Sequence, residues 1–417
     1  MTKILSALLL LLNQFAFGQQ KLLQFSVSAG NYSYMDCPFC IDLSPLSAEN
    51  IQTLALFENL ESSLIPVKYQ LEVGNKTLLW FIADGRFESG EKRIYSIFKD
   101  TLEESQPKKI QIQRNSDNLI LTNQGQNILN YRISEIHPPK GIDSLYRRSA
   151  YLHPLRSPGG EILTRIQPPD HYHHYGIWNP YTLTHINGRE IDYWNLGKGE
   201  GTVRFAGLLS TTEGNLFGGF RIHKEFIDFG ASEFNKVSIN ETMEIRYWDA
   251  SQQSKRYILD YRTQLNSAIE DTITFDAYRY GGGIGFRATE KWKKETCTVL
   301  TSEGKERKEA DGSRARWCII EGISSVPAGR SGILFLSHPF NREHPEPMRV
   351  WPLESNEGQM FFEFCPIRHK SWNIIQGQIY SLNYRMIVFD GEMTKEEAEM
   401  YWNAFARPPV VTVHTEK

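Results

Sequence analysis

The sequence predicts an all-β protein, with a large many-stranded β-sandwich, a smaller N-terminal β-domain and a short C-terminal helix. Two observations predict this fold class. Short apolar or alternating runs recur along the chain, and Gly, Asn or Asp interrupts them at the spacing typical of sandwiches and barrels. Only one segment, near residue 400, has the pattern of a helix. With 417 residues the chain is long enough for two or three domains.

The expected strands occur in both halves of the chain. In the first half they lie within residues 21–30, 65–73, 77–85, 108–133 and 202–210. In the second half they lie within residues 237–249, 256–266, 271–289, 331–340 and 379–391. The helix is expected at 395–406, because Thr394 is a good N-cap, two glutamates follow in the first turn, and Pro408 comes soon after the end.

A loop-like stretch around residues 125–140 indicates a domain boundary. We therefore expect an N-terminal β-sandwich at 19–127, whose size is typical of one sandwich domain. A large catalytic β-sandwich is expected at 128–391, followed by a C-terminal helix and tail at 392–417.

Residues 1–18 have the pattern of a signal peptide. Lys3 provides the positive charge, residues 4–12 form a short apolar core, and Ala16 and Gly18 give a small-x-small cleavage site. The apolar run is too short to span a bilayer, and no other segment resembles a membrane span. We expect a periplasmic or secreted protein that has no membrane contact once the signal is removed.

The charge of the chain disfavours nucleic acid as a partner. The net charge is −3, and no long basic run is present. Phosphate binding requires a clustered cationic surface.

Cys37 and Cys40 have the C-x-x-C spacing of redox and zinc sites. The flanking residues look like strands, whereas a thioredoxin-type motif is followed by a helix, and a zinc ribbon needs a second cysteine pair. A local disulfide or two partly buried thiols is the favoured interpretation.

The stretch DHYHHYGIW at 170–178 contains three of the eleven histidines. If it forms a strand, His171 and His173 point to one face and His174 to the other, which weakens a compact local metal site. A metal site that uses two of these imidazoles and a third ligand from elsewhere in the chain remains an open alternative. The favoured interpretation is acid–base chemistry, because histidine titrates near neutral pH and tyrosine can transfer a proton.

The neighbours of the histidines suit a carbohydrate. Tyr172, Tyr175 and Tyr181 interleave with the imidazoles, and Trp178 and Trp194 offer flat apolar faces that can stack on a sugar. For each ring alone, packing in the core is the more common role.

Further polar groups follow in the chain. Arg156 lies upstream, Tyr280 and Arg287 flank the glycines at 281–283, and His338 and Arg342 lie in a proline-rich loop. The glycine run lacks the G-K-[ST] of a phosphate loop, so it is expected to let the backbone bend or approach another surface.

This inventory favours elimination over hydrolysis. A glycosidase requires two carboxyl groups across the scissile bond, and nothing singles out a pair among Asp170, Glu190 and Asp192. Elimination from a uronic acid requires a cation at the substrate carboxylate, a His or Tyr base at C5, and a second His or Tyr that protonates the leaving oxygen. A hydrolase or mutarotase, and a non-catalytic sugar-binding module, remain alternatives.

The motifs DHYHHYGIW, INGREIDYW, YGGGIGFRA, ARWCIIEG and GILFLSHPFNREHPEP occur in order. With them the chain resembles, over about residues 130–391, the PmoA-like family of exported bacterial proteins, which has no known function and is often labelled a methane oxygenase component. Tyr175 stands where that family usually has arginine, and Tyr172 replaces a common proline. The resemblance implies a sandwich similar to galactose mutarotases and polysaccharide lyases, in a polysaccharide-degradation setting.

The combined prediction is an exported carbon–oxygen lyase or dehydratase acting on uronic-acid-containing oligosaccharides, without a cofactor or bound metal. The catalytic candidates are His173, His174, His171, Tyr175, Tyr280 and His338. The substrate-binding candidates are Arg287, Arg342, Trp178 and Arg156.

Overall fold

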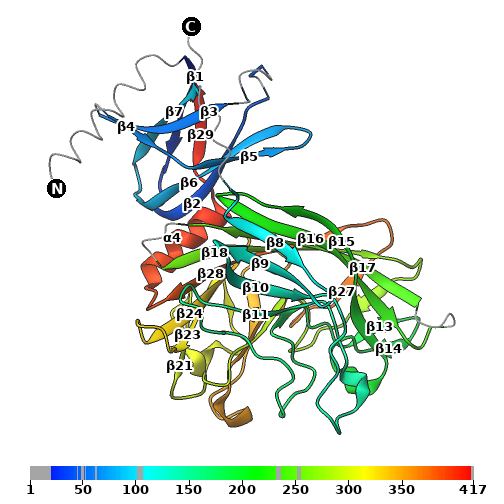
Figure 1. Ribbon diagram of the computed structural model, residues 1–417. Helices are drawn as coiled ribbons and strands as arrows, with labels where there is room; N and C mark the ends of the chain where they lie inside the picture. The colour runs from blue at the N-terminus through cyan, green and yellow to red at the C-terminus, as the bar shows by residue number, and fades with distance from the viewer. Residues whose placement is uncertain are drawn as a thin grey trace. The chain divides into compact units, whose positions relative to one another are not determined.

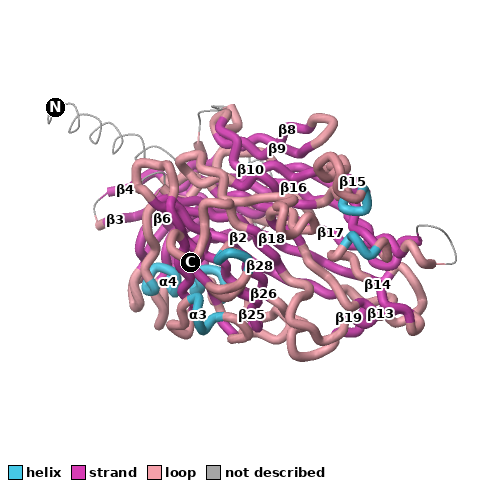
Figure 2. The backbone as a smooth tube through the Cα atoms, turned by 90° about the horizontal axis from the view of Figure 1, so that it is seen from below, coloured by secondary structure: helices cyan, strands magenta, loops and turns pink. Residues whose placement is uncertain are grey.

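The computed structural model describes most of the chain and shows an all-β protein (Figure 1). The described residues are 20–44, 46–47, 51, 53–61, 63–100, 107–231, 236–250 and 255–414. The predicted signal peptide at 1–18 lies outside them. Strands dominate the backbone and the helices are short (Figure 2). The prediction of an all-β sandwich is confirmed.

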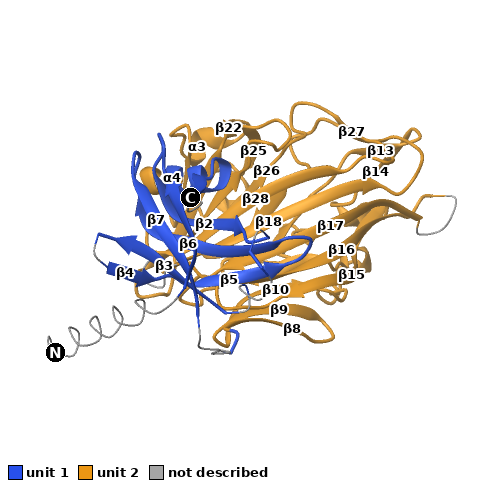
Figure 3. Ribbon diagram, turned by 90° about the horizontal axis from the view of Figure 1, so that it is seen from above, with its two compact units in different colours: residues 1–108, 399–417 blue, residues 109–398 orange. Residues whose placement is uncertain are grey.

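The chain divides into two compact units (Figure 3). Unit 1 consists of residues 1–108 and 399–417, and unit 2 of residues 109–398. Each unit has its own hydrophobic core.

Unit 1 contains two antiparallel sheets. The five-stranded sheet has the order β29 (Val410–His414), β1 (Lys21–Ser28), β7 (Lys92–Lys99), β3 (Leu54–Leu60) and β4 (Ser63–Pro66). The three-stranded sheet has the order β2 (Tyr34–Asp42), β6 (Thr77–Phe87) and β5 (Tyr69–Val73). Phe25 of β1 and Phe81 of β6 pack together with ring centroids 5.7 Å apart, so the apolar faces of the two sheets form one core.

Unit 2 contains a nine-stranded, an eight-stranded and a four-stranded sheet. The first has the order β22 (Arg314–Ala315), β25 (Glu346–Val350), β26 (Phe361–Phe364), β20 (Ile284–Arg287), β12 (Ile177–Trp178), β11 (Tyr151–Leu155), β10 (Gln126–Arg132), β9 (Asn118–Asn123) and β8 (Ile110–Arg114). The second has the order β15 (Gly201–Thr212), β16 (Phe217–Asp228), β17 (Lys236–Trp248), β18 (Arg256–Ser267), β28 (Tyr380–Asp390), β24 (Arg330–Ser337), β23 (Trp317–Ile323) and β21 (Cys297–Thr301). The third has the order β14 (Arg189–Ile191), β13 (Thr184–Ile186), β19 (Ile273–Phe275) and β27 (Trp372–Ile374).

The two large sheets of unit 2 pack face to face. Phe335 of the eight-stranded sheet lies 4.7 Å from Phe362 and 5.4 Å from Phe286 of the nine-stranded sheet, measured between ring centroids. Tyr131 and Phe220 make the same kind of contact at 5.6 Å. Alternate residues of these strands are apolar and buried, which is the pattern that produces a sandwich core.

Helices are few among the described residues. The α-helices are α3 (Arg307–Ala310) and α4 (Lys395–Ala406), and the 3-10 turns are η2 (Ser144–Tyr146), η3 (Leu196–Lys198) and η4 (Asn356–Gly358). The predicted N-cap of α4 is confirmed, because Thr394 Oγ1 accepts from the Glu397 backbone N–H at 3.2 Å. The Glu397 carboxylate in turn accepts from the Thr394 N–H at 2.9 Å, which completes a capping box.

The domain boundaries differ from the expected ones at 127/128 and 391/392. Strand β9 pairs with β10 and β8 pairs with β9 in the large sheet, so unit 2 begins at Lys109. The tail at 410–414 is strand β29, which pairs with β1 and therefore belongs to unit 1. Both differences arise from long-range strand pairing, which local composition does not reveal.

Two further expectations concern single segments. Cys37 and Cys40 lie on β2, where a separation of three residues sends their side chains to opposite faces, which disfavours a disulfide between them. Within the described residues, no helix has the length and apolar character required to cross a membrane.

Candidate functional site

The three clustered histidines lie in a turn before β12, not on a strand. The His171 N–H donates to the Pro168 carbonyl at 2.9 Å, and the His174 N–H donates to the His171 carbonyl at 3.1 Å. The predicted alternation of faces is therefore wrong, because successive turns after the prolines replace the extended backbone. As a result, the three imidazole rings converge in one cluster.

The imidazoles form a compact cluster. The ring centroids are 4.7 Å apart for His171 and His174, 4.8 Å for His173 and His174, and 5.3 Å for His171 and His173. One nitrogen from each ring lies within 4.8 Å of the other two, a spacing from which the set could hold a metal ion.

His174 is the buried member of the cluster, with an exposed fraction of 0%. Its ring lies against aromatic side chains, with centroid distances of 5.1 Å to Phe361, 5.4 Å to Trp351 and Trp178, and 5.5 Å to Trp194. Neither of its ring nitrogens has a hydrogen-bond partner among the described residues. Burial holds the pKa of His174 well below its usual range, so the imidazole is neutral.

His173 and His171 are half-buried at the rim. Burial, with a smaller contribution from His171, lowers the pKa of His173 to about 3, so this ring is also neutral near pH 7. The Trp194 indole N–H donates to the His173 carbonyl at 3.1 Å and helps to fix the turn.

Asp170 orients His171. The carboxylate lies 2.8 Å from His171 Nδ1 and accepts two contacts from Arg287 Nη2, at 2.7 and 3.0 Å. Although burial acts to raise the pKa of Asp170, the His171 hydrogen bond and the Arg287 charge lower it to about 2. The carboxylate is thus ionised at neutral pH, so Nδ1 carries the proton and Nε2 is the nitrogen of His171 left for a ligand.

The sheet explains why distant residues meet here. β12 pairs with β20, β20 with β26, and β26 with β25, so the histidine turn, Arg287, Phe361 and Trp351 lie at adjoining strands. The Arg287 guanidinium carbon lies 4.7 Å from the centroid of the Trp351 ring, which itself lies 4.8 Å from His171.

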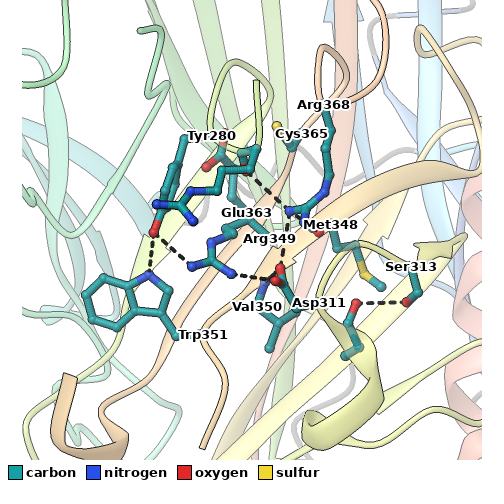
Figure 4. A network of polar contacts seen from close by, with 12 residues as sticks. Tyr280, Asp311, Ser313, Met348, Arg349, Val350, Trp351, Glu363, Cys365 and Arg368 are labelled. Carbon is teal, nitrogen blue, oxygen red and sulfur yellow. Dashed lines mark hydrogen bonds and ion pairs between the residues drawn. The ribbon is translucent and has the colours of Figure 1, made fainter. Parts of the chain in front are cut away.

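A polar network continues from Trp351 to Tyr280 (Figure 4). The Tyr280 hydroxyl oxygen accepts from the Trp351 indole N–H at 3.1 Å and from Arg349 Nη2 at 3.0 Å. Arg349 is fixed by an ion pair with Asp311 at 2.6 Å. Two donors therefore converge on the hydroxyl oxygen of the half-buried Tyr280, an arrangement that would stabilise negative charge on it.

The glycine run beside Tyr280 has the backbone role predicted for it. Gly283 has φ of 62°, and a Cβ there would lie 2.1 Å from the Phe364 carbonyl oxygen. The run therefore lets this segment lie directly against β26, and the Gly281 N–H donates to the buried Glu363 carboxyl at 2.6 Å.

A sequence profile of a family of unknown function, DUF6807, matches residues 118–403, which include the whole site. The chain belongs to the DUF6807 family. The family description states no activity, and no curated protein matches the chain. The resemblance to the PmoA-like family stays a prediction.

In this DUF6807 member, five of the ten predicted site residues join the cluster directly, and a sixth, Tyr280, joins through Trp351. The five are His171, His173, His174, Trp178 and Arg287. However, Trp178 is 1% exposed and lies beneath His174, so it cannot serve as an open sugar platform. Arg287 is 0% exposed and bound to Asp170, and it also donates to Gln359, so it holds the turn in place rather than facing a substrate.

Of the other four predicted residues, Tyr175 packs in the same aromatic cluster as Trp178 and Trp351 but has its hydroxyl bound elsewhere, and the remaining three lie away from the histidines. The Tyr175 hydroxyl is bound to the Tyr146 carbonyl and to Gln167, and burial raises the pKa of Tyr175 to about 12. Arg342 donates to the Ser371 carbonyl at 2.8 Å and lies over Trp372, while the His338 ring packs on Phe340 at 5.1 Å. Arg156 lines a separate cavity of about 700 Å³ beside His153.

The carboxylates named for a hydrolase have structural partners. Asp192 is 1% exposed and accepts from the backbone N–H groups of Trp194 and Asn195, at 2.9 and 2.7 Å. Glu190 pairs with Lys198 at 3.1 Å. Both side chains stabilise the loop that carries Trp194.

Sequence reasoning missed Trp351, Phe361 and Asp311. Trp351 follows β25 and Phe361 lies on β26, about 180 positions after the histidines in the chain, and Asp311 follows α3. The only local signal was the apolar composition of the WPL and MFFEF segments, which equally fits core strands.

Proposed function

We propose that the protein is an exported carbohydrate-active enzyme, a carbon–oxygen lyase or dehydratase that acts on uronic-acid-containing oligosaccharides in polysaccharide breakdown. The observation that supports this most strongly is the Tyr280 hydroxyl, which receives two hydrogen bonds beside half-exposed imidazoles.

Tyr280 is the residue best suited to move the proton. Acting as the base, with its oxygen held by hydrogen bonds from Arg349 and Trp351, it removes the proton from C5 of the uronate. The C5 electron pair forms the C4=C5 double bond, the C4–O bond breaks, and the leaving oxygen takes the proton from Tyr280. The base is thereby restored, and the products are an unsaturated uronate and a free hydroxyl.

The charges around the site favour an acidic substrate. Arg279 is exposed, and its guanidinium carbon lies 5.4 Å from the Tyr280 ring centroid. Arg279 is the cation that binds the substrate carboxylate, the role that the sequence suggested for Arg287. Arg287 itself is buried and paired with Asp170. Both Asp170 and Asp192 already have fixed partners, so this arrangement favours elimination over two-carboxylate hydrolysis.

The test is incubation with a panel of uronate-bearing oligosaccharides, followed by ultraviolet absorbance of the unsaturated uronate. We expect Tyr280→Phe to lower kcat by about 10²- to 10⁴-fold, the usual contribution of a proton-transfer residue. Tyr278→Phe is the matched control, since its ring lies only 5.9 Å from that of Tyr280 and it should keep most of the activity.

Other outcomes would replace the proposal. Release of reducing sugar without an absorbance gain would indicate a hydrolase. Saturable sugar binding without any product, unchanged by Tyr280→Phe, would indicate a non-catalytic binding module.

A further inference from the structure

The cluster of His171, His173 and His174 has a feature that proton transfer does not explain. His174 is fully buried, and both of its ring nitrogens lack partners among the described residues. A buried polar atom left without a hydrogen bond destabilises the fold, because it has lost the water that bound it in the unfolded chain. A bound ion is one of the usual reasons for such a group.

We propose that His171, His173 and His174 bind a divalent transition-metal ion. One nitrogen from each ring already lies within 4.8 Å of the others. In a tetrahedral site with metal–nitrogen bonds of about 2.05 Å, these nitrogens are about 3.4 Å apart. Small side-chain rotations within one turn would close this difference.

The residue types fit a metal of the zinc or cobalt class. Three imidazoles are the ligands of several zinc enzymes, and they leave a coordination position for water or substrate. The half-buried rings of His171 and His173 place that position toward solvent.

The residues around the three histidines also suit a bound metal ion. A metal-binding histidine commonly donates its other N–H to a carboxylate, and Asp170 accepts in that way from His171 Nδ1 at 2.8 Å. Arg287 pairs with the same carboxylate, so the Asp170–Arg287 pair adds no net charge beside the ion. Trp194, Trp351 and Phe361 cover His174 and keep water from its buried side.

The ion would add a second cation, besides Arg279, to bind the substrate carboxylate in uronate elimination. Bound to three neutral imidazoles, it can hold the substrate carboxylate and make the C5 proton more acidic. This role rests on the proposed function, whereas the binding of the ion does not.

The test uses the full mature chain without a histidine tag. The protein is stripped with a chelator, dialysed against Zn²⁺ or Co²⁺, and its bound metal is measured by elemental analysis. We expect about one ion per chain, with visible absorption bands in the Co²⁺ form. His171→Ala and His173→Ala should each abolish this binding, and Asp170→Ala should weaken it about 10- to 100-fold.

His137→Ala is the matched control, because His137 is exposed and lies outside the cluster. A thermal unfolding midpoint close to that of the control shows that each variant is folded. Less than a tenth of an ion per chain in the native protein, or binding unchanged in folded His171→Ala and His173→Ala, would overturn the metal site.

The two proposals fail separately. One bound ion without product from any uronate supports the metal site and overturns the lyase. Unsaturated uronate formed by a metal-free protein that cannot be reloaded supports the lyase and overturns the metal site.

Discussion

Ionisation of Asp170 makes the free energy of unfolding depend on pH, and Asp170→Asn tests this dependence. The contacts with His171 and Arg287 lower the pKa of this carboxyl from 3.8 to about 2. A lowering of that size corresponds to about 2 kcal/mol of folding stability at pH 7. Because the folded-state pKa lies below the unfolded one, the contribution is complete above about pH 5 and disappears as the pH falls through about 2.

We therefore expect Asp170→Asn to lower the free energy of unfolding by about 2 kcal/mol at pH 7 and by only about 1 kcal/mol at pH 3. Denaturant titration followed by tryptophan fluorescence measures this, since seven of the nine tryptophans lie in unit 2. The exposed Asp271→Asn serves as control and should change stability by less than about 0.5 kcal/mol. An equal loss at both pH values would refute the electrostatic reasoning.

Two further predictions concern the framework of unit 2. Lys224 and Glu241 form a buried pair at 2.8 Å, so Lys224→Met should destabilise by about 3–5 kcal/mol, while adding Glu241→Met should recover most of the loss in denaturant titrations. If the double variant is no more stable than the single one, the buried charge is not the cause. Gly176 has φ of 63°, and a Cβ there would lie 2.2 Å from the Leu152 carbonyl oxygen, so Gly176→Ala should lose about 2 kcal/mol or more in thermal unfolding. Gly188→Ala has comparable backbone strain without a close contact, and an equal loss there would show that the clash is unimportant.

What could be predicted from the sequence was local. The capping box of α4 depends on residues three apart, and the strand content depends on patterns within about ten residues. The histidines were found because they are adjacent in the chain. Their arrangement was predicted wrongly, since the assumed strand is a turn held by hydrogen bonds from His171 and His174.

The remainder of the site depends on long-range pairing. Trp351 and Phe361 reach the histidines because β26 lies beside β20 and β25 lies beside β26, a strand order that composition does not encode. His338 and Arg342 were chosen by residue type in a loop, and the structure gives them other partners. The solvent exposure of individual side chains could not be predicted either, because nothing in the neighbouring sequence indicated that Arg287 would be fully buried.

The pairing of β29 with β1 has a consequence for synthesis of the chain. A growing chain that has reached residue 398 already contains every strand of unit 2 but still lacks one edge strand of unit 1. Until residues 410–414 are made, β1 presents an unpaired edge of the kind that promotes aggregation. Strand β29 thus completes a sheet whose other strands lie about 300 or more positions earlier in the chain.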